Sequence, residues 1–391
     1  MNSLLVDIEQ NLDPFPLYET MRQSYPVYHD PQRSSWHVFR YKDVMRVLSD
    51  YATFSSQFRG SEPADPSSPF SASIISSDPP RHHQLRSLVA QAFTPHAVEA
   101  LVPRITEIVS ERLDRALTSG RMDVIQDLGY PLPVIVIAEL LGIPSQDRQR
   151  FKHWSDYAVH ATDSGTRIDH ERFSGSEMME MGQYFLATIE KRRQVAGDDL
   201  ISRLLKASIH GEHLNQMELL GFCVLLLVAG NETTTNLIGN AMAAFAEQPE
   251  VWESLRARPE LLPQAIEEVL RYRSPVQAMF RTTTGEVKID HQTIPARAQV
   301  VAWIGSANHD SAQFHEPARL DIKRSPNHHL AFGHGIHFCL GAPLARLEAR
   351  IALGAMLERI KRFSLAPDAS LERQASLIVY GLRSLPITYA L

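Results

Sequence analysis

The sequence predicts a mainly helical protein with a small β portion, and three observations support this fold class. Segments with helical periodicity fill most of the chain before Pro275, and several begin with a capping residue followed by proline. After Pro275, short apolar runs alternate with turn residues, a pattern typical of strands. The chain has 391 residues, 44% of them hydrophobic, which is enough for one large domain or two ordinary ones.

Helix starts can be placed in order along the chain. Asp78 before Pro79 and Thr94 before Pro95 are each typical of an N-cap with proline in the first turn, and Ser145 predicts a third start. The other predicted helices span residues 146–159, 178–193, 216–248, 250–258, 261–273 and 341–361. The longest of these would extend about 50 Å, a span that crosses a whole domain.

Strands and loops are predicted from the remaining segments. Residues 276–280, 287–289 and 299–304 are expected to be short strands, and the tail with Gly381 and Pro386 to be strand and turn. Five prolines between residues 60 and 80 predict a loop without regular helix. A loop of that length is often a lid or a binding loop.

Charge and cysteine content exclude several classes of protein. The 39 basic and 45 acidic residues give a net charge of −6, and no basic block is present that would attract nucleic acid or anionic lipid. Two cysteines cannot form a disulfide framework, which favours a reducing, cytoplasmic location. The N-terminus lacks a signal-peptide pattern, and no apolar run reaches the length of a membrane anchor. We therefore expect a soluble protein.

The most informative segment spans residues 332–341, with the sequence FGHGIHFCLG. Cys339 comes directly before a predicted helix, where free N–H groups and the helix dipole favour a thiolate that could bind a redox-active metal. The glycines of this segment would let the backbone approach a flat, bulky group. Two other interpretations remain open from these residues alone. Cys339 is a core residue, or it binds zinc with His334 and His337, although their spacing is not that of a usual zinc module.

One stripe of the long predicted helix has an unusual middle. Leu226, Ala229, Gly230, Thr233, Thr234 and Leu237 share a face. A packed core stripe is the ordinary interpretation, yet glycine and a run of threonines are poor helix formers. Because threonine hydroxyls can bond the carbonyl one turn back, the pattern predicts a local opening of this helix.

Residues 332–341 match, at every signature position, the haem-binding loop of the cytochrome P450 family, Phe-x-x-Gly-x-x-x-Cys-x-Gly. Four further segments resemble motifs of the same family. Residues 229–234 resemble its oxygen-activation motif, 268–271 its Glu-x-x-Arg pair, 78–86 its propionate-binding helix start and 381–386 its C-terminal turn. The five motifs occur in family order over nearly the whole chain.

The resemblance implies one cytochrome P450 domain over residues 1–391, mainly α with small β-sheets, with haem b buried between the long central helix and the cysteine loop. Cys339 is then the thiolate ligand of the iron, and Glu232 with Thr233 form the catalytic acid–alcohol pair that handles protons during dioxygen activation. The other implied haem-binding residues are His82, Arg86, Ala229, Gly230, Arg281, Phe332, Gly333, His337 and Gly341. Cys223 lies in an apolar run and is expected to be a core thiol.

Glu268 and Arg271 lie three residues apart on one helix face, and this spacing alone favours an ordinary surface pair. The resemblance implies instead a buried ion pair that braces the segment before Cys339. Two positions depart from the family pattern. His309 follows Ala307-Asn308, near which the family usually has the third, arginine member of the brace, and Leu320 stands where phenylalanine is usual.

The implied activity is that of a haem-thiolate monooxygenase, which inserts one atom of dioxygen into a hydrophobic small molecule of fatty acid, terpenoid, steroid or macrocycle type. Electrons would come from NAD(P)H through a separate ferredoxin or flavodoxin with its reductase, because the chain has no length left for a fused reductase. We expect Arg346 and Arg350 to lie near the cysteine side, where an acidic ferredoxin could dock. We expect a monomer.

Two alternatives stay open beside this reading, namely a peroxide-driven hydroxylase and a non-catalytic haem sensor or electron carrier. The Glu232–Thr233 pair argues against both. Substrate contacts are expected from segments that the family places over the haem, and the residues chosen are Phe70, Ile74, Ile75, Leu226, Val276, Met279, Ile378 and Val379. These side chains are apolar, while Arg59 and Arg167 could hold the carboxylate of a fatty acid.

Overall fold

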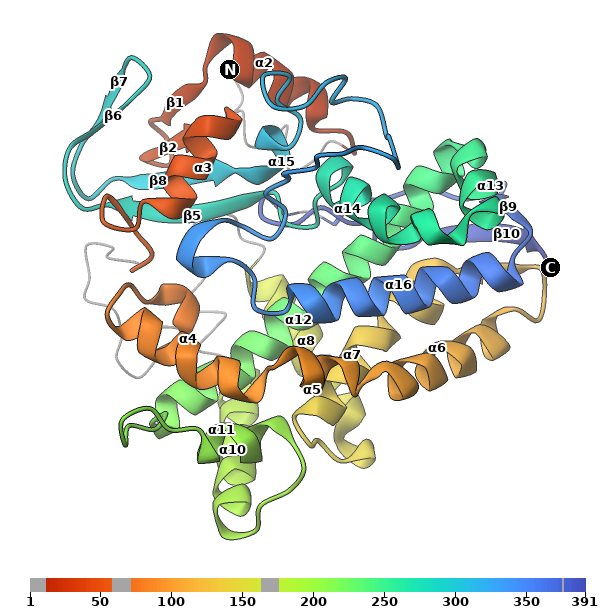
Figure 1. Ribbon diagram of the computed structural model, residues 1–391, viewed down its shortest axis with the longest axis horizontal. Coiled ribbons are helices and arrows are strands. Elements are labelled where there is room, and N and C mark those ends of the chain that lie inside the picture. Colours follow the sequence, from red (N-terminus) through yellow and green to blue (C-terminus); the bar gives the residue numbers. More distant parts are fainter. Residues whose placement is uncertain (1–11, 58–71, 163–175, 375) are drawn as a thin grey trace.

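The computed structural model describes residues 12–57, 72–162, 176–374 and 376–391, and most of them are helical (Figure 1). The α-helices are α2 (Phe15–Ser24), α3 (Tyr41–Ser49), α4 (Arg81–Ala92), α5 (Pro95–Glu99), α6 (Val102–Ala116), α7 (Pro131–Leu140), α8 (Arg148–Thr162), α10 (Ser176–Gln194), α11 (Leu200–Lys206), α12 (Gln216–Glu247), α13 (Pro249–Ala257), α14 (Leu262–Tyr272), α15 (Ile304–Ala307) and α16 (Ala342–Arg359). Shorter helical turns are η1 (Ile74–Ser76), η2 (Val124–Gly129), η3 (Ser145–Asp147), η4 (Pro259–Leu261) and η5 (Gly335–His337).

Three small sheets accompany the helices. The strands are β1 (Val27–Asp30), β2 (Ser35–Val38), β3 (Phe54–Ser55), β4 (Arg121–Asp123), β5 (Ala278–Thr283), β6 (Val287–Ile289), β7 (Gln292–Ile294), β8 (Gln299–Trp303), β9 (Arg362–Leu365) and β10 (Pro386–Ala390). The largest sheet has the order β1-β2-β8-β5-β3, with β2 parallel to β8 and the other neighbours antiparallel. The other two have the orders β4-β10-β9 and β6-β7. The mainly helical fold with small sheets is as the sequence predicts.

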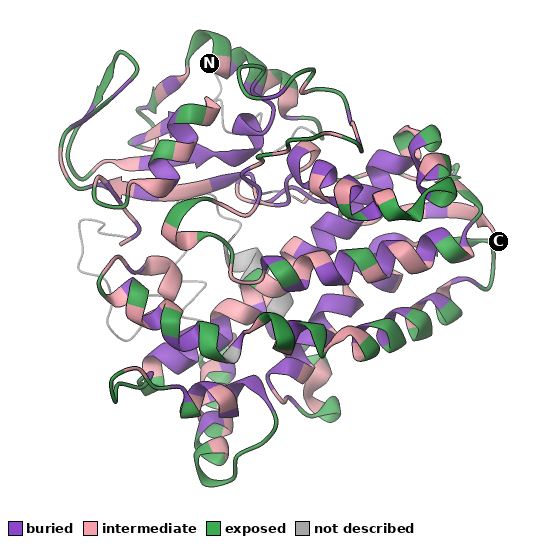
Figure 2. Cartoon of the chain, in the orientation of Figure 1, coloured by how far each residue is buried: buried purple, intermediate pink, exposed green. Residues whose placement is uncertain are grey.

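Helix α12 is the central element of the helical part. It begins with a capping box, in which Asn215 and Glu218 each bond the other's backbone N–H, and it continues unbroken for 32 residues. It contacts α7, α10, α14 and α16, and most of its residues are buried (Figure 2). Among the described residues it is the one helix long and apolar enough to cross a membrane, but more than half of its most apolar window is buried inside the protein, as expected of a core helix.

The unbroken α12 corrects the prediction of a local opening. The Thr233 hydroxyl does donate a hydrogen bond to the Ala229 carbonyl one turn back, at 2.8 Å, and the Thr235 hydroxyl likewise donates to the Asn231 carbonyl at 3.0 Å. These bonds add to the helix without displacing its backbone ladder.

Helix starts follow the predicted residues at one site and differ at two others. Thr94 caps α5 by accepting a hydrogen bond from the Ala97 N–H, as predicted. Asp78 does not cap α4, because its carboxylate accepts from the backbone of Ser56 and from the Ser55 hydroxyl, and α4 begins only at Arg81. Ser145 is likewise no cap, because it is the first residue of the short turn η3 before α8.

The strand predicted from residue 276 begins two residues later, as β5. Val276 instead forms an isolated antiparallel bridge with Val379 in the C-terminal turn. Helix and sheet meet at the segment of residues 332–341, called the cysteine loop below, which enters α16 (blue in Figure 1). The loop also contacts α3 through η5, so it lies between the largest sheet and the helical core.

Candidate functional site

The cysteine loop has a fixed backbone that depends on two glycines. Gly333 and Gly335 have φ values of 75° and 74°, a region that residues with a side chain rarely adopt. A Cβ atom on Gly335 would also lie 2.9 Å from the Cα of Ser49 in α3. The Cys339 N–H donates to the Phe332 carbonyl at 2.9 Å and closes the loop. The loop geometry therefore requires glycine at positions 333 and 335.

Cys339 lies three residues before the start of α16 and is exposed. The many protein atoms around its sulfur raise the pKa of the thiol, while hydrogen bonds from the Gly341 and Ala342 N–H groups act in the opposite direction. The charges of Arg86 and Arg346 also favour the thiolate. The other cysteine, Cys223, is buried in the core, and burial raises the pKa of its thiol to about 12. Of the two cysteines, Cys339 is thus the one whose sulfur is accessible to a ligand.

Histidine and arginine side chains gather beside Cys339 from three separate segments. The His82 ring, on α4, packs against the His337 ring at a centroid distance of 4.4 Å, and Arg86 donates to the Phe338 carbonyl at 2.7 Å. Arg281, on β5, is buried and donates to the carbonyl of its neighbour Phe280. These four side chains are among the residues that the resemblance implies for haem binding.

The electrostatics of this cluster indicate a site for an anion. Burial and the Arg86 charge together lower the pKa of His82 to about 4. Burial also lowers the pKa of Arg86, and it lowers that of Arg281 to about 10. The guanidinium charges of Arg86 and Arg281 are thus poorly solvated, and a carboxylate placed beside them would stabilise both.

The cluster also contains an orphaned polar group. His82 is fully buried, yet neither of its ring nitrogens has a hydrogen-bond partner among the described residues. A buried polar group without a partner is costly, and it usually marks a position where a ligand or water completes the hydrogen bonds. Together with the open thiol of Cys339 and the 40% exposed ring of Phe338, the residues present fit a flat, apolar group that carries carboxylates.

Helix α12 has small and polar residues in the segment that resembles the oxygen-activation motif. Ala229 is exposed in the middle of this mostly buried helix, and Thr233 and Glu232 are partly buried next to it. Gly230 has a packing role that the sequence analysis did not foresee. A Cβ atom there would lie 2.9 Å from Cδ1 of Ile137, so the glycine permits the close approach of α7.

A buried acid beside this stripe was missed by the sequence analysis. Glu348, on α16, is 1% exposed and hydrogen-bonds Thr234 on α12. Burial raises the pKa of its carboxyl to about 8, so the group is mostly neutral at pH 7. The signal was present in the sequence, because Glu348 occupies the apolar face of its helix between Leu344 and Leu347 on one side and Ala352 on the other.

The Glu268–Arg271 ion pair is fully buried and bidentate, rather than lying on the surface. Arg271 donates to both oxygens of the Glu268 carboxylate at 2.9 and 2.8 Å, and it also donates to the carbonyls of Asn308, Pro317 and Arg319. Arg324, whose side chain is 9% exposed, is a second arginine on the same carboxylate, at 3.2 and 3.1 Å. Arg324 therefore provides the third charge, and the sequence analysis did not find it.

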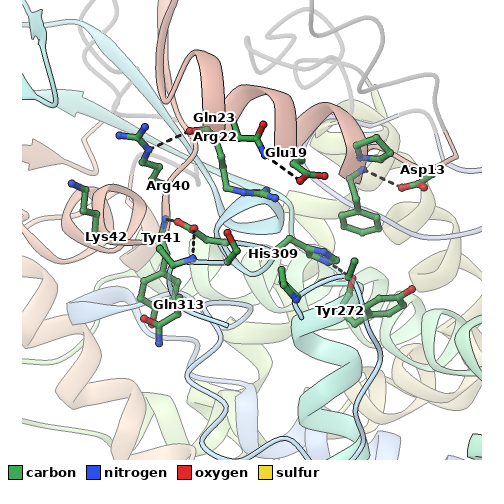
Figure 3. Close-up of a pocket in the computed structure, with 17 residues that line it drawn as sticks. Asp13, Glu19, Arg22, Gln23, Arg40, Tyr41, Lys42, Tyr272, His309 and Gln313 are labelled. Atoms are coloured by element: carbon green, nitrogen blue, oxygen red, sulfur yellow. Dashed lines mark hydrogen bonds between the residues drawn. The ribbon is translucent and has the colours of Figure 1, made fainter. Parts of the chain in front are cut away.

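The two departures from the family pattern have structural explanations. His309 is buried, its ring stacks on Phe15 at 4.2 Å, and its Nε2 is 2.8 Å from the Tyr272 carbonyl (Figure 3). Burial and the Arg271 charge lower the pKa of His309 to about 3, so it contributes no charge to the brace. Leu320 is buried in the main hydrophobic core, where it fills the position without an aromatic ring.

A second cluster fixes the other side of the cysteine loop. Arg346, on α16, forms a bidentate pair with Glu267 of α14, with both distances 2.7 Å, and its guanidinium lies 4.4 Å from the centre of the Phe332 ring. His329 bonds the same carboxylate at 3.1 Å. Arg350 is exposed. Of the two arginines expected at a docking surface, Arg346 is thus engaged by Glu267, and Arg350 has no acidic partner among the described residues.

The predicted substrate residues are partly brought together. Val276 and Val379 form a β-bridge, and the Gln277 N–H donates to the Ile378 carbonyl at 2.7 Å. The predicted substrate segments around Val276 and Val379 are therefore joined. Ile74, Ile75, Leu226 and Met279 are each partly buried. Phe70, Arg59 and Arg167 lie outside the described residues.

A cavity of about 930 Å³ lies elsewhere, between α2, the start of α3 and residues 309–318 (Figure 3). Arg22, Arg40 and Lys42 line it together with Asp13, Glu19 and Asp310, so the charges of its wall cancel. None of the residues predicted for the haem or the substrate lines this cavity. It is therefore separate from the site around Cys339.

Known proteins that resemble this chain do so over nearly its whole length. A model of the family described as cytochrome P450 matches residues 5–258 and 254–379. Cytochrome P450 monooxygenase PikC of Streptomyces venezuelae is 40% identical, with 96% of this chain and 91% of that protein covered. The erythromycin C-12 hydroxylase of Saccharopolyspora erythraea is also 40% identical, with coverages of 94% and 92%. The crystal structure of CYP109E1 from Bacillus megaterium in complex with testosterone is 42% identical, with a TM-score of 0.87 and coverages of 97% and 100%.

Proposed function

This chain belongs to the cytochrome P450 family and is a monooxygenase, and from that premise we propose that it oxidises bulky apolar molecules with electrons from a separate redox partner. The family implies haem as the cofactor. The observation that carries the proposal is the convergence of His82, Arg86, Arg281 and His337 beside the open thiol of Cys339.

In this proposal the residues around the cysteine loop hold the haem. Cys339 would hold the iron through its sulfur, and the N–H groups of Gly341 and Ala342, which bond that sulfur, would tune its electron donation. The unpartnered nitrogens of His82, with Arg86, Arg281 and His337, would hold the propionates. When bound, the haem supplies the redox iron at which dioxygen is activated.

The residues of α12 then handle protons. The Thr233 hydroxyl donates a hydrogen bond to the Ala229 carbonyl at 2.8 Å. It can rotate to donate its proton to another acceptor, because the hydrogen bond that it gives up is not part of the backbone ladder of the helix. Glu232 is its neighbour and is the acid that would replace the proton on Thr233 Oγ1. An acid–alcohol pair of this kind serves dioxygen activation by external electrons better than direct use of peroxide.

The substrate class is inferred from the apolar residues and from the relatives. Val276, Met279, Ile378 and Val379 contribute aliphatic and thioether side chains. One relative is named for the hydroxylation of erythromycin, and a solved relative is bound to testosterone. We therefore infer a steroid-like, macrolide-like, terpenoid or fatty-acid substrate bound mainly by apolar burial, at roughly 25 cal/mol per Å². A cytoplasmic enzyme that receives NAD(P)H electrons through a ferredoxin or flavodoxin and its reductase fits this proposal.

Reconstitution tests the proposed function. The purified haem protein is titrated with steroids, terpenoids, fatty acids and a macrolide while the Soret band is followed. Each compound that shifts the band is then incubated with NADPH, a surrogate ferredoxin and its reductase, or with hydrogen peroxide alone. We expect hydroxylated product with the electron-transfer partners. Product from peroxide alone would favour the peroxide-driven alternative, and shifts only with small, polar compounds would contradict the apolar-substrate assignment.

A further inference from the structure

Asn240 joins three elements through one buried amide. It lies on α12 and is 1% exposed. Its Nδ2 atom donates hydrogen bonds to the carbonyls of Arg273 and Tyr380, both at 3.0 Å. Arg273 is the C-cap residue directly after α14, where the carbonyls have no partner within the helix. Tyr380 directly follows Ile378 and Val379, two of the residues that we place at the substrate.

The segment that Asn240 holds is itself a joined unit. Besides the Val276–Val379 bridge and the Gln277–Ile378 hydrogen bond, the Tyr380 N–H donates to the Pro275 carbonyl at 2.8 Å. Residues 275–277 and 378–380 therefore move together, and we call them the bridged turn. A single attachment to α12 can consequently position substrate-contacting side chains from both segments of the bridged turn.

Asn240 lies on the same side of α12 as Thr233. Seven residues separate them, which is nearly two full turns and a rise of about 10.5 Å. Asn236 lies between them, and the turn packs so closely here that a Cβ atom on Gly381 would lie 1.9 Å from Asn236 Oδ1. One rigid helix thus carries both the proton-handling hydroxyl and the attachment point of the bridged turn.

We propose that Asn240 is a positioning residue for substrate oxidation, because its amide fixes the bridged turn at a set distance from Thr233 along α12. The inference rests on the proposed function in one respect only, that the bridged turn contacts substrate. The attachment itself depends on the two hydrogen bonds and the close packing at Gly381.

The chemistry of the attachment requires an amide. The Asn240 NH2 group has two N–H donors, and it satisfies two buried carbonyls at once. Aspartate has nearly the same shape but offers only acceptors to these carbonyls, so Asn240→Asp replaces two attractions by two repulsions. Gly381→Ala instead disturbs the packing of the adjacent turn against Asn236 of α12, and it leaves Asn240 intact.

Hydrogen exchange of the haem-loaded enzyme tests the attachment without a substrate. We expect exchange in residues 376–382 to accelerate about fivefold or more in Asn240→Asp, since one hydrogen bond is worth about a factor of five, and to accelerate also in Gly381→Ala. Glu247→Gln is the matched control, because Glu247 also joins α12 to Arg273, at 2.9 and 2.7 Å, but it bonds the Arg273 guanidinium rather than the bridged turn. Unchanged exchange in both test variants would overturn the proposal.

Ligand binding then separates this inference from the proposed function. Testosterone and imidazole are titrated in the Soret band of each variant, since imidazole is a small ligand of the iron and testosterone is large enough to reach the turn. We expect testosterone affinity to fall severalfold in Asn240→Asp with imidazole affinity unchanged. If no lipophile binds the unmodified enzyme, the substrate assignment fails while the exchange result still decides the attachment. Faster exchange with unchanged binding of every lipophile that the unmodified enzyme binds would overturn the positioning role.

Discussion

Arg324 Nε lies 3.2 and 3.1 Å from the two carboxylate oxygens of Glu268, so that this buried carboxylate is shared between two arginines. Asn327 also donates to it, at 3.1 Å. Glu268 thereby connects α14 with the segment of residues 321–327 that leads into the cysteine loop. The relationship gives Arg324 a structural importance that the Glu-x-x-Arg spacing does not reveal.

Arg324→Ala should weaken haem retention and stability. Removing one partner of a buried pair typically costs 3–5 kcal/mol, because the remaining charge is left uncompensated, and here the Arg271 contact should reduce that cost to about 2–3 kcal/mol. Denaturant unfolding and haem content measure the effect. Arg319→Ala is the control, since Arg319 forms an exposed pair with Glu316 that should be worth under about 1 kcal/mol. Equal losses in the two variants would argue against the shared carboxylate as a brace.

Cys339→Ser should abolish the strongly red-shifted Soret band of the reduced carbonyl complex, because that band requires a thiolate ligand. Cys223→Ser should keep it, since Cys223 is buried in the core and the pKa of its thiol is raised to about 12. The absorption spectrum of each reduced, carbonyl-treated variant makes the measurement. Loss of the band in Cys223→Ser alone would reverse the ligand assignment.

Thr233→Ala should bind haem and substrate normally but divert electrons from product to hydrogen peroxide. Proton transfer by a positioned group is typically worth about 10²–10⁴-fold, so the loss of coupling should be large. The ratio of product to NADPH consumed measures it, with a substrate from the lipophile titration. Thr233→Ser keeps the hydroxyl and should keep coupling. Thr235→Ala is a second control, because that hydroxyl is already engaged by the carbonyls of Gly129 and Asn231. Unchanged coupling in Thr233→Ala would remove Thr233 from the proton path.

Arg350→Glu should slow reduction by an acidic ferredoxin about threefold to tenfold at low ionic strength and make the rate less dependent on salt. Arg350 is exposed on α16 and its change should leave the cysteine loop intact. Arg346 is less suitable for this test, because a glutamate there would face Glu267 and disturb the Phe332 ring. Stopped-flow reduction at several salt concentrations measures the effect. Equal rates for Arg350→Glu and the unmodified enzyme at low salt would exclude Arg350 from the docking surface.

Short-range patterns predicted much of this protein because their causes are local. The Thr94 cap, the long α12 and the cysteine at the start of α16 all depend on residues adjacent in sequence. Asp78 was wrongly predicted as a helix cap, because its carboxylate accepts hydrogen bonds from Ser55 and Ser56, more than twenty residues earlier. The sequence alone gives no measure of that competition.

The residues that were missed depend on contacts between distant segments. Arg324 contacts Glu268, which lies 56 positions earlier in the chain, and Glu348 of α16 contacts Thr234 of α12. Gly230 was interpreted as part of a locally opened helix, whereas the close approach of Ile137 of α7 explains it. In each case the residue type suggested a role. That role depends on a contact partner, which is determined only by the packing of the helices.

Glu348 should make stability depend on pH in a recognisable way. Its pKa is raised by burial from its ordinary value of 4.5 to about 8, so between these values the folded state holds a proton that the unfolded state has lost. The free energy of unfolding should therefore fall as pH rises through this window, by at most about 1.4 kcal/mol per pH unit from this group, and level off above pH 8.

Glu348→Gln isolates that contribution, because glutamine has the same shape, can still bond the Thr234 hydroxyl and cannot ionise. The difference in unfolding free energy between the variant and the unmodified protein should be small near pH 5 and should grow in favour of the variant up to about pH 8. Denaturant unfolding at several pH values measures this difference, and other titrating groups cancel because both proteins contain them. A difference that stays constant from pH 5 to pH 8 would mean that the Glu348 carboxyl ionises in the folded protein much as it does in water, and that its burial next to Thr234 does not hold the proton.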